Sequence, residues 1–211
     1  MNRFIIKRPD EEHYETVIDL ILQDFRVRER MFVCSGATPE DPREGHELYR
    51  DWIQQGVSLI AVDTEDGHIV GAAVNMIVQK ENNTFEISPE MSVRQRFFYT
   101  MIGQIESGVD FFEELQVDKG IELTLLSVKK DFAGRGLGKK LTEETIQLAK
   151  TLGYKFVQSV PTAPETIHIF ESAGFETRNE RKFSDFSEFE GSPAFPLATP
   201  TDRARFVIKK L

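Results

Sequence analysis

The chain has 211 residues, a length that suits one sizeable domain and is short for two. With 40% apolar and 29% charged residues, it has the composition of a globular protein that can bury a core. Its formal charge of −9 argues against nucleic acid or an anionic membrane as a partner, and would suit a cationic small molecule. We therefore predict a single domain over residues 1–211.

The first half of the chain combines short strands with amphipathic helices. A β-branched run predicts a strand, apolar residues at helical spacing follow, and a paired strand pattern around Gly67 indicates an antiparallel hairpin. Between the two predicted helices, residues 34–42 are typical of a loop. The predicted elements are a strand at 3–8, helices at 11–32 and up to about 55, and strands at 57–63 and 68–80.

The second half alternates strands and helices. Residues 91–116 fit one long helix or two with a break near Gly108, and residues 121–128 have the apolar run of a central buried strand. The remaining predicted elements are a helix at 136–152, a strand at 154–160, a helix that ends at 173, and strands at 175–183 and 204–211. This order predicts an α/β protein in which one mixed sheet is wrapped by helices.

The single cysteine, Cys34, excludes an intrachain disulfide, and we interpret it as a packed or half-exposed thiol. The four histidines have no metal spacing, so we expect no metal. The N-terminal stretch becomes charged after three apolar residues, too soon for a signal peptide or a membrane span. We expect a cytoplasmic protein without a membrane partner, either a monomer or a homodimer.

The segment that carries chemistry is residues 127–141, SVKKDFAGRGLGKKL, where a buried strand leads into a glycine-rich turn and a helix. Between Lys129 and Lys140 it has five basic residues against one acid. Positive charge beside the free amides of a helix start predicts a phosphate or pyrophosphate site. The loop lacks the ending of a P-loop and the glycine spacing of a dinucleotide fingerprint. An acyl-CoA pyrophosphate loop and a plain surface turn remain as interpretations.

This loop resembles the R-x-x-G-x-G motif of the GNAT acetyltransferases, with Ala133 in place of the first residue and Gly136 and Gly138 in position. Downstream, IFESAGFE at 169–176 is similar to the second motif of that family. The last hundred residues, including RKFSDFSEFEGSPAF and RFVIKKL, most resemble insect-type arylalkylamine N-acetyltransferases, and the first half does so more weakly. The resemblance implies a GNAT fold with about seven strands, acetyl-CoA as co-substrate, and a small primary amine, such as an arylalkylamine, as acceptor.

The resemblance also implies which residues hold acetyl-CoA. The pyrophosphate would bind the turn and helix start formed by Gly134, Arg135, Gly136, Leu137, Gly138 and Lys139. We expect strand 121–128 to splay from strand 154–160, so that the acyl-pantetheine lies between them. The strand residues there are Leu126, Ser127 and Val128, and Phe170 completes the predicted cofactor site.

Direct acetyl transfer needs a neutral amine, and alkylamines are protonated at neutral pH. In the insect-type enzymes a glutamate at the end of the first helix is the base, and the matching stretch FRVRERM puts Glu29 in that place. Its neighbours Arg28 and Arg30 are expected to lower the pKa of its carboxyl. Glu29 could instead be a solvated or salt-bridged helix residue. The alternative carboxylates are Glu40, Asp41, Glu44 and Glu47.

Many GNAT enzymes use a tyrosine to reprotonate the CoA thiolate. Phe170 stands at that position in this chain and has no proton to give. The insect-type enzymes use serines earlier in that helix, which correspond to Thr162 or Ala163 and to Thr166. Thr166 is then the candidate hydroxyl, although helix capping by Thr162 and packing by Thr166 remain open. His168 is interpreted as a surface or packing residue.

Two other functions remain open on the sequence. The acceptor could be a polyamine, another aliphatic amine or a protein N-terminus. Ala133, Phe170 and the altered surroundings of Glu29 would also fit a degenerate module that binds acyl-CoA without catalysis. Some of the 17 phenylalanines could line an aromatic amine pocket, and the sequence does not indicate which.

Overall fold

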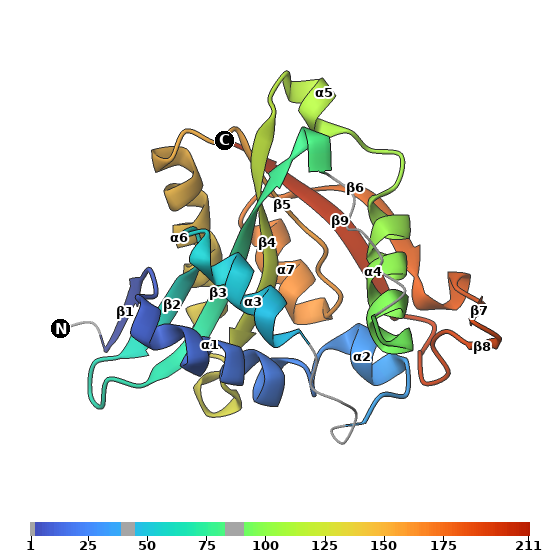
Figure 1. The fold of residues 1–211 in the computed structure, drawn as a ribbon, viewed down its shortest axis with the longest axis horizontal. Helices are drawn as coiled ribbons and strands as arrows, with labels where there is room; N and C mark the ends of the chain where they lie inside the picture. The colour runs from blue at the N-terminus through green and yellow to red at the C-terminus, as the bar shows by residue number, and fades with distance from the viewer. Residues whose placement is uncertain (1–2, 39–44, 83–90) are drawn as a thin grey trace.

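The computed structural model describes residues 3–38, 45–82 and 91–211. Its centre is a seven-stranded sheet in the order β1-β2-β3-β4-β5-β9-β6 (Figure 1). The strands are β1 (Phe4–Lys7), β2 (Leu59–Asp63), β3 (Ile69–Gln79), β4 (Lys119–Val128), β5 (Phe156–Ser159), β6 (Glu176–Lys182) and β9 (Arg203–Lys210). Only β4 and β5 pair in parallel, which confirms the predicted mixed sheet of about seven strands.

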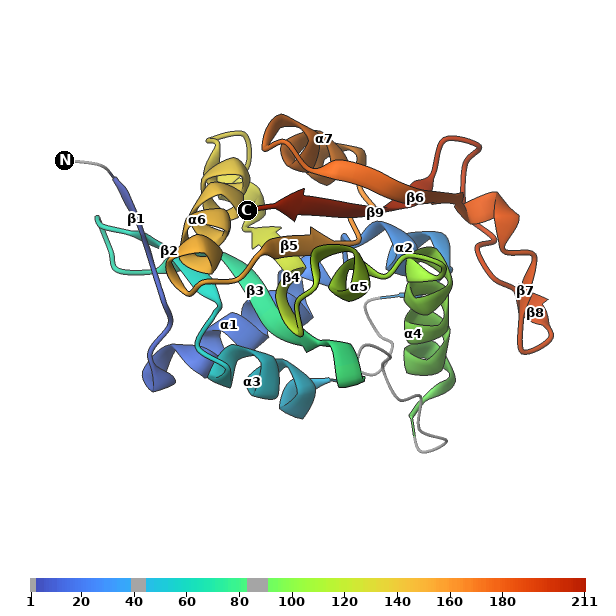
Figure 2. The ribbon, with the colours of Figure 1, turned by 90° about the horizontal axis from the view of Figure 1, so that it is seen from above.

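Helices cover both faces of this sheet. The helices are α1 (Tyr14–Leu20), α2 (Arg30–Cys34), α3 (His46–Gln54), α4 (Val93–Glu106), α5 (Phe111–Leu115), α6 (Leu137–Thr151) and α7 (Pro164–Ser172). Figure 2 shows α6 and α7 on one side of the sheet and α1, α3 and α4 on the other. In the described part of the chain, no helix is long and apolar enough to cross a bilayer.

Short helical turns and one small hairpin connect these elements. Single 3₁₀ turns lie at Glu11–His13, Lys80–Asn82, Lys130–Phe132 and Phe183–Asp185, and a π-helical turn, η2, lies at Ile21–Phe25. The hairpin consists of β7 (Glu188–Phe189) and β8 (Ser192–Pro193). Most predicted elements are present with ends shifted by one or two residues, and the predicted break near Gly108 separates α4 from α5.

The predicted single helix over 11–32 is wrong at its C-terminal end. The helical pattern continues through α1 and η2, but the chain leaves it after Phe25 and Glu29 is extended, with φ −60° and ψ 130°. A new helix, α2, begins at Arg30. The break occurs because the Glu29 carboxylate accepts hydrogen bonds from the backbone amides of Met31 and Phe32, which an uninterrupted helix would use internally.

The sheet opens at its centre. On the β3 side, β4 pairs along its whole length. Leu123 lies opposite Asn75 and Leu125 lies opposite Val74, so Thr124 is the extra residue of a β-bulge. On the β5 side, the parallel pairing is confined to Ile121 with Val157 and Glu122 with Gln158. Beyond the bulge, β4 and β5 are separate in the described residues, which confirms the predicted splay.

Candidate active site

A cavity of about 300 Å³ lies where β4 and β5 separate. One half of its wall comes from the sheet, the segment that joins β5 to α7, and α7 itself, and the other half comes from residues 25–32, α3 and α4. The lining includes the predicted site residues Glu29, Leu126, Ser127, Val128, Thr166 and Phe170. The fold therefore gathers into one cavity residues as far apart in the sequence as Glu29 and Phe170.

The sheet half of the cavity is the open edge of β4. Leu126 and Val128 pair with Ala73 and Gly71 of β3. The other edge of β4 at these two residues faces the cavity instead of a strand. The last side-chain bridge to β5 runs from the Ser159 hydroxyl, which donates to the Leu123 carbonyl oxygen at 2.7 Å. Past that bridge, Arg28 donates to the Val128 carbonyl oxygen, and the remaining backbone groups of this edge are available to a ligand that lies along the strand.

Glu29 lies at the junction of the two halves. Its Oε1 accepts from the Met31 amide at 3.0 Å and from the Thr162 hydroxyl at 2.6 Å, and its Oε2 accepts from the Phe32 amide at 2.7 Å. The carboxylate therefore caps α2 and connects that helix to the segment between β5 and α7. These hydrogen bonds hold the carboxylate in one orientation from both sides.

Burial raises the pKa of the Glu29 carboxyl, against the hydrogen bonds from Thr162 and the backbone, which lower it. The expectation that Arg28 and Arg30 would lower this pKa is wrong, because both arginines bind other partners. Arg28 pairs with Asp24 and donates to the Val128 carbonyl oxygen at 2.9 Å. Arg30 forms two hydrogen bonds, 2.6 and 2.7 Å long, with the buried Asp202.

The predicted hydroxyl residues occupy different places. Thr166, on α7, lines the cavity, as does Phe170, whose ring is buried and packs edge-to-face on Phe175 with centroids 4.6 Å apart. Thr162 contacts Glu29 and does not cap α7, since the residue at the cap is Ala163, without a side-chain hydrogen bond. His168 lies outside this cavity's lining and is exposed, as predicted for a surface residue.

The glycine-rich turn lies outside the cavity lining, at the start of α6. Gly134 and Gly136 have φ of 73° and 76°, in the left-handed region, so they turn the chain as few other residues could. The first helical hydrogen bond of α6 runs from the Lys140 amide to the Gly136 carbonyl oxygen. The amides of the four residues 136–139 therefore have no acceptor within the helix. A Cβ on Gly138 would lie 3.1 Å from Ile169 and 3.9 Å from Leu126, so this helix start adjoins the cavity.

The charged and apolar side chains of this turn have separate partners. Arg135 turns back over the Phe132 ring, with 5.1 Å from Cζ to the centroid, and donates to the Asp131 carbonyl oxygen. Lys139 contacts Glu143 at 3.8 Å, and Leu137 is buried in the core beneath α6. The side chain of Leu137 therefore cannot reach a ligand, although its amide can.

Sequence reasoning missed most of the helical half of the cavity. Aromatic side chains from two helices line it, and they are Tyr49 and Trp52 of α3 and Phe98 and Tyr99 of α4. The apolar side of α3 was visible in the sequence, but its meeting with α4 depends on contacts between segments about 40 residues apart. Of the alternative carboxylates, Glu47 is exposed beside His46, and Glu40, Asp41 and Glu44 lie outside the described residues.

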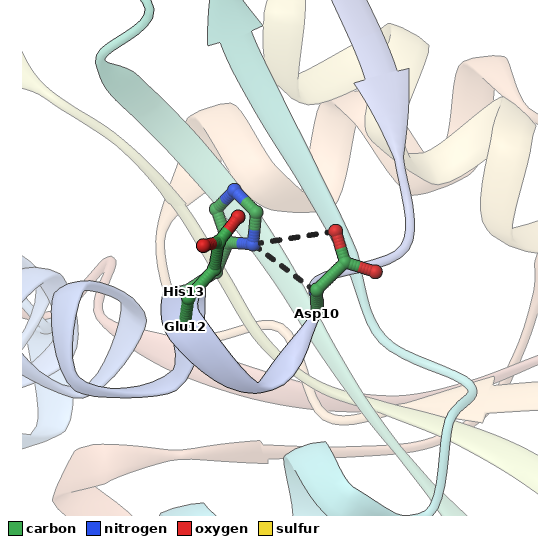
Figure 3. A group of neighbouring side chains, drawn as sticks. All are labelled: Asp10, Glu12 and His13. Carbon is green, nitrogen blue, oxygen red and sulfur yellow. Dashed lines mark hydrogen bonds and ion pairs between the residues drawn. The ribbon is translucent and has the colours of Figure 1, made fainter.

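One group of side chains in the described ranges could bring three ligand atoms together around a metal, namely Asp10, Glu12 and His13 (Figure 3). The His13 Nδ1 atom already accepts a hydrogen bond from the Asp10 amide at 3.1 Å and lies 3.7 Å from the Asp10 carboxylate. These contacts belong to the cap of the 3₁₀ turn at Glu11–His13. This group is explained by local structure and is not part of the cavity.

Solved structures share this fold. An arylalkylamine N-acetyltransferase 2 from Aedes aegypti is 23% identical, with a TM-score of 0.84 and 99% of each chain covered. A mosquito arylalkylamine N-acetyltransferase like 5b is 16% identical, with a TM-score of 0.88 over 99% of this chain and 100% of the other. A polyamine N-acetyltransferase from Drosophila melanogaster is 17% identical, with a TM-score of 0.81 over 99% and 100%. These identities show a common fold and do not indicate a common substrate.

No curated protein sequence matches the chain. The model of the acetyltransferase (GNAT) family matches residues 16–175, which include Glu29, the open edge of β4, the glycine-rich turn and α7. This match covers more than half of the chain, and its span includes the strands and helices that form the cavity. The chain belongs to the acetyltransferase (GNAT) family.

Proposed function

We propose that this protein transfers the acetyl group of acetyl-CoA to a small primary amine, and that the amine is an arylalkylamine. The observation that carries the proposal is the single cavity in which the open edge of β4 meets Glu29. A thioester that lies along the strand and an amine that enters from the helices would then meet beside a carboxylate. Family membership supports the reaction class, and the cavity supports the kind of acceptor.

The residues near β4 and α6 fit acetyl-CoA. The pantetheine would lie along Leu126, Ser127 and Val128, whose cavity side has no strand partner in the described chain. The pyrophosphate would bind the amides of residues 136–139, because free amides and the helix dipole at the start of a 15-residue helix favour an anion. Lys139 and Lys140 add positive charge next to those amides.

Glu29 would act on the amine. A protonated amine gives one proton to the carboxylate, directly or through water, and its nitrogen lone pair then attacks the thioester carbon. The carbon–sulfur bond breaks, the second proton of the nitrogen passes to the departing sulfur to give CoA, and Glu29 then releases the first proton to water. The raised pKa of Glu29 strengthens it as a base, since a carboxyl with an ordinary pKa near 4.3 holds a proton weakly at neutral pH. Thr166 is the hydroxyl proposed near the sulfur.

The walls of the helical half favour an aromatic acceptor. Tyr49, Trp52 and Phe98 line this half, and an aryl group packs well against aromatic side chains. A polyamine would instead need several carboxylates, and Glu29 is the one acidic residue in the described lining. The lining therefore favours an arylalkylamine over the polyamine named for the Drosophila structure.

The experiment that tests this proposal is the release of CoA in mixtures of the purified protein, acetyl-CoA and single amines, followed with a thiol reagent. The amines are aromatic primary amines with and without further charged groups, aliphatic polyamines, and a short peptide with a free N-terminus. We expect release with aromatic amines to exceed release with polyamines. Binding of CoA without release for any amine would identify an acyl-CoA-binding module and refute the proposed activity.

A further inference from the structure

The positive charge of Arg30, the residue after Glu29, is paired with a buried carboxylate. Its guanidinium donates two hydrogen bonds to Asp202, from Nε at 2.6 Å and from Nη2 at 2.7 Å. Asp202 is 6% exposed and lies just before β9, 172 residues further along the chain. Two parallel hydrogen bonds of this kind are the strong form of an arginine–carboxylate pair. The Arg30–Asp202 pair therefore connects the start of α2 to the C-terminal part of the sheet.

Asp202 is itself held in place by its own turn. Its Oδ2 accepts from the Thr199 amide at 2.6 Å and from the Thr199 hydroxyl at 2.8 Å. A second contact joins the same two segments, because the Leu197 amide donates to the carbonyl oxygen of Cys34, the last residue of α2, at 3.0 Å. Both ends of this five-residue helix are therefore fixed to residues 197–202.

The orientation of the Glu29 carboxylate depends on where α2 lies. The carboxylate accepts from the amides of Met31 and Phe32, in the first turn of that helix. It also accepts from the Thr162 hydroxyl, which comes from the opposite half of the cavity. A shift of α2 would move the two amides relative to this hydroxyl. The ion pair at the start of α2 consequently helps to keep the carboxylate where the two halves of the cavity meet.

The same ion pair determines which charges act near Glu29. Burial raises the pKa of the Cys34 thiol to about 11, and the charges of Arg30, Asp202 and Glu29 also act on that pKa. The three charges therefore lie close enough to one thiol to influence it together. While Asp202 balances Arg30, the guanidinium does little to stabilise the Glu29 carboxylate. Without that balance, the cation would favour the ionised carboxylate and make it a weaker base.

Other titratable and charged groups share the cavity with Glu29 and come from several elements. In the described lining they are Arg26, Arg28 and Arg30 of residues 25–32, Tyr49 of α3, and Arg94 and Tyr99 of α4. Arg28 pairs with Asp24, and the charge of Glu165 on α7 acts on Arg30. The described lining contains no acid besides Glu29. The carboxylate that balances Arg30 therefore comes from outside the cavity.

We propose that Asp202 is a positioning residue for Glu29: it holds Arg30, and with it the start of α2, and it balances the charge of that guanidinium beside the base. The proposal rests on the acetyltransferase activity proposed above and deepens it. Asp202 does not line the cavity and acts only through Arg30. This arrangement accounts for a base that stands between two arginines in the sequence.

The test uses two opposite changes of charge and their combination. Asp202→Asn leaves Arg30 unbalanced, so the pH at which kcat reaches half of its plateau should fall by about one unit. This is the effect of a unit charge several Å away at an effective dielectric constant of about 20. Arg30→Met leaves Asp202 as an unbalanced anion and should raise that pH. Arg30→Met combined with Asp202→Asn removes both charges and should restore the wild-type midpoint.

A second measurement follows Glu29 without any acceptor. An NMR titration of isotope-labelled glutamate carboxyl carbons gives the pKa of Glu29, whose signal is assigned by its loss in Glu29→Gln. This pKa should fall in Asp202→Asn and return to the wild-type value in the variant that lacks both charges. Thermal unfolding shows that each variant is folded. If Asp202→Asn does not fold, Arg30→Met compared with the double variant reports the same charge of Asp202.

Two controls separate charge from the loss of an ion pair. Arg30→Lys keeps the positive charge and should have a midpoint close to that of the wild type. Glu114→Gln breaks the ion pairs of Glu114 with Arg178 and Lys210, outside the cavity lining. It should leave both the kcat midpoint and the pKa of Glu29 unchanged.

The outcomes distinguish this inference from the proposed activity. A folded Asp202→Asn variant with the wild-type midpoint and the wild-type pKa of Glu29 would overturn the inference and leave the acetyltransferase activity standing. Shifts in the same direction in both single variants would indicate a rearranged α2 and would also overturn it. No release of CoA with any amine would refute the activity, while the NMR titration would still decide whether Asp202 controls the charge at Glu29.

Discussion

Glu29 combines two tasks that usually belong to different residues. As the cap of α2 it accepts hydrogen bonds from two amides, and such bonds stabilise the charged carboxylate. As a candidate base it must also take up a proton. Burial outweighs that stabilisation, so the pKa of the Glu29 carboxyl is raised. The two tasks predict different effects on rate and on stability, so variants can separate them.

We predict that Glu29→Asp lowers kcat strongly while it retains the fold. Aspartate is a good helix cap, but its carboxylate would be withdrawn by one methylene from the amine. Glu29→Ala should lower kcat by about 10²–10⁴-fold, as expected for loss of a general base, and should also cost about 1 kcal/mol through the lost cap. The measurements are steady-state rates and thermal unfolding.

The pH profile distinguishes a base from a positioned cap. Because the pKa of Glu29 is raised, the wild-type kcat should rise with pH through a titration that lies above the ordinary glutamate range. This step should be missing in Glu29→Ala. If Glu29→Ala loses stability but keeps more than a third of the wild-type kcat, the residue is a cap and not a base.

Among the elements, those with a strong local pattern could be predicted from the sequence, and those set by distant contacts could not. The helix α6 and strand β4 have apolar periodicity and glycine boundaries, so their limits were predicted within two residues. The break before α2 depends on a side chain that binds its own backbone, which apolar periodicity does not reveal. The aromatic wall depends on how α3 meets α4, which no local signal encodes.

The glycine-rich turn before α6 gives a prediction at the level of an element. Gly136→Asp should weaken CoA binding by at least about tenfold, because it adds a negative charge and a side chain where the pyrophosphate is proposed to bind. Both Gly136 and Gly153 have positive φ, 76° and 83°, with open space where a side chain would begin, and they flank the same helix at opposite ends. Calorimetric titration with CoA measures the effect.

Gly153→Asp is the matched control for this prediction. It carries the same backbone strain and the same charge as Gly136→Asp, but lies at the C-terminal end of α6. Its CoA affinity should stay at the wild-type value. Equal losses in the two variants would mean that strain in α6, and not the lost anion site, weakens binding, and the pyrophosphate site would have to be moved.

At the scale of the whole molecule, we expect a pair of largely buried carboxyls to make stability depend on pH. Glu106 ends α4 and Glu122 lies on β4, where it accepts hydrogen bonds from Gln158 at 3.0 Å and from Thr124 at 3.4 Å. The Glu106 Oε1 atom is buried and has no hydrogen-bond partner among the described residues. Burial first, and then the charge of Glu122, raise the pKa of Glu106.

A folded-state pKa above the unfolded one means that the native protein holds a proton that the unfolded chain releases. Stability is therefore greatest below the ordinary glutamate pKa of about 4.3 and falls as pH rises toward the folded pKa. We predict that Glu106→Gln, which cannot ionise, is more stable than the wild type by about 1–3 kcal/mol at pH 8, because its unfolded chain gains nothing from releasing a proton and one pKa unit corresponds to about 1.4 kcal/mol. Urea unfolding at several pH values measures this difference.

Glu113→Gln provides the comparison, because Glu113 is an exposed glutamate whose pKa is lowered by Lys80. The stability that Glu113 contributes is lost only as pH falls. The curve of stability against pH for Glu113→Gln should therefore run parallel to that of the wild type between pH 6 and 9. A wild-type curve that is flat over this range, and equal to that of Glu106→Gln, would show that Glu106 is ionised in the folded protein.

The position of β9 between β5 and β6 bears on how the protein is made on the ribosome. Strands β1 to β4 pair with their sequence neighbours and can assemble as they emerge. By contrast, β5 shares two residue pairs with β4 and four with β9, and β6 pairs with β9 alone in the described sheet. A nascent chain without residues 203–210 therefore exposes an unpaired β5 edge, open to pairing with other chains. The β5 side of the cavity wall therefore gains its second strand neighbour only after residues 203–210 have been made.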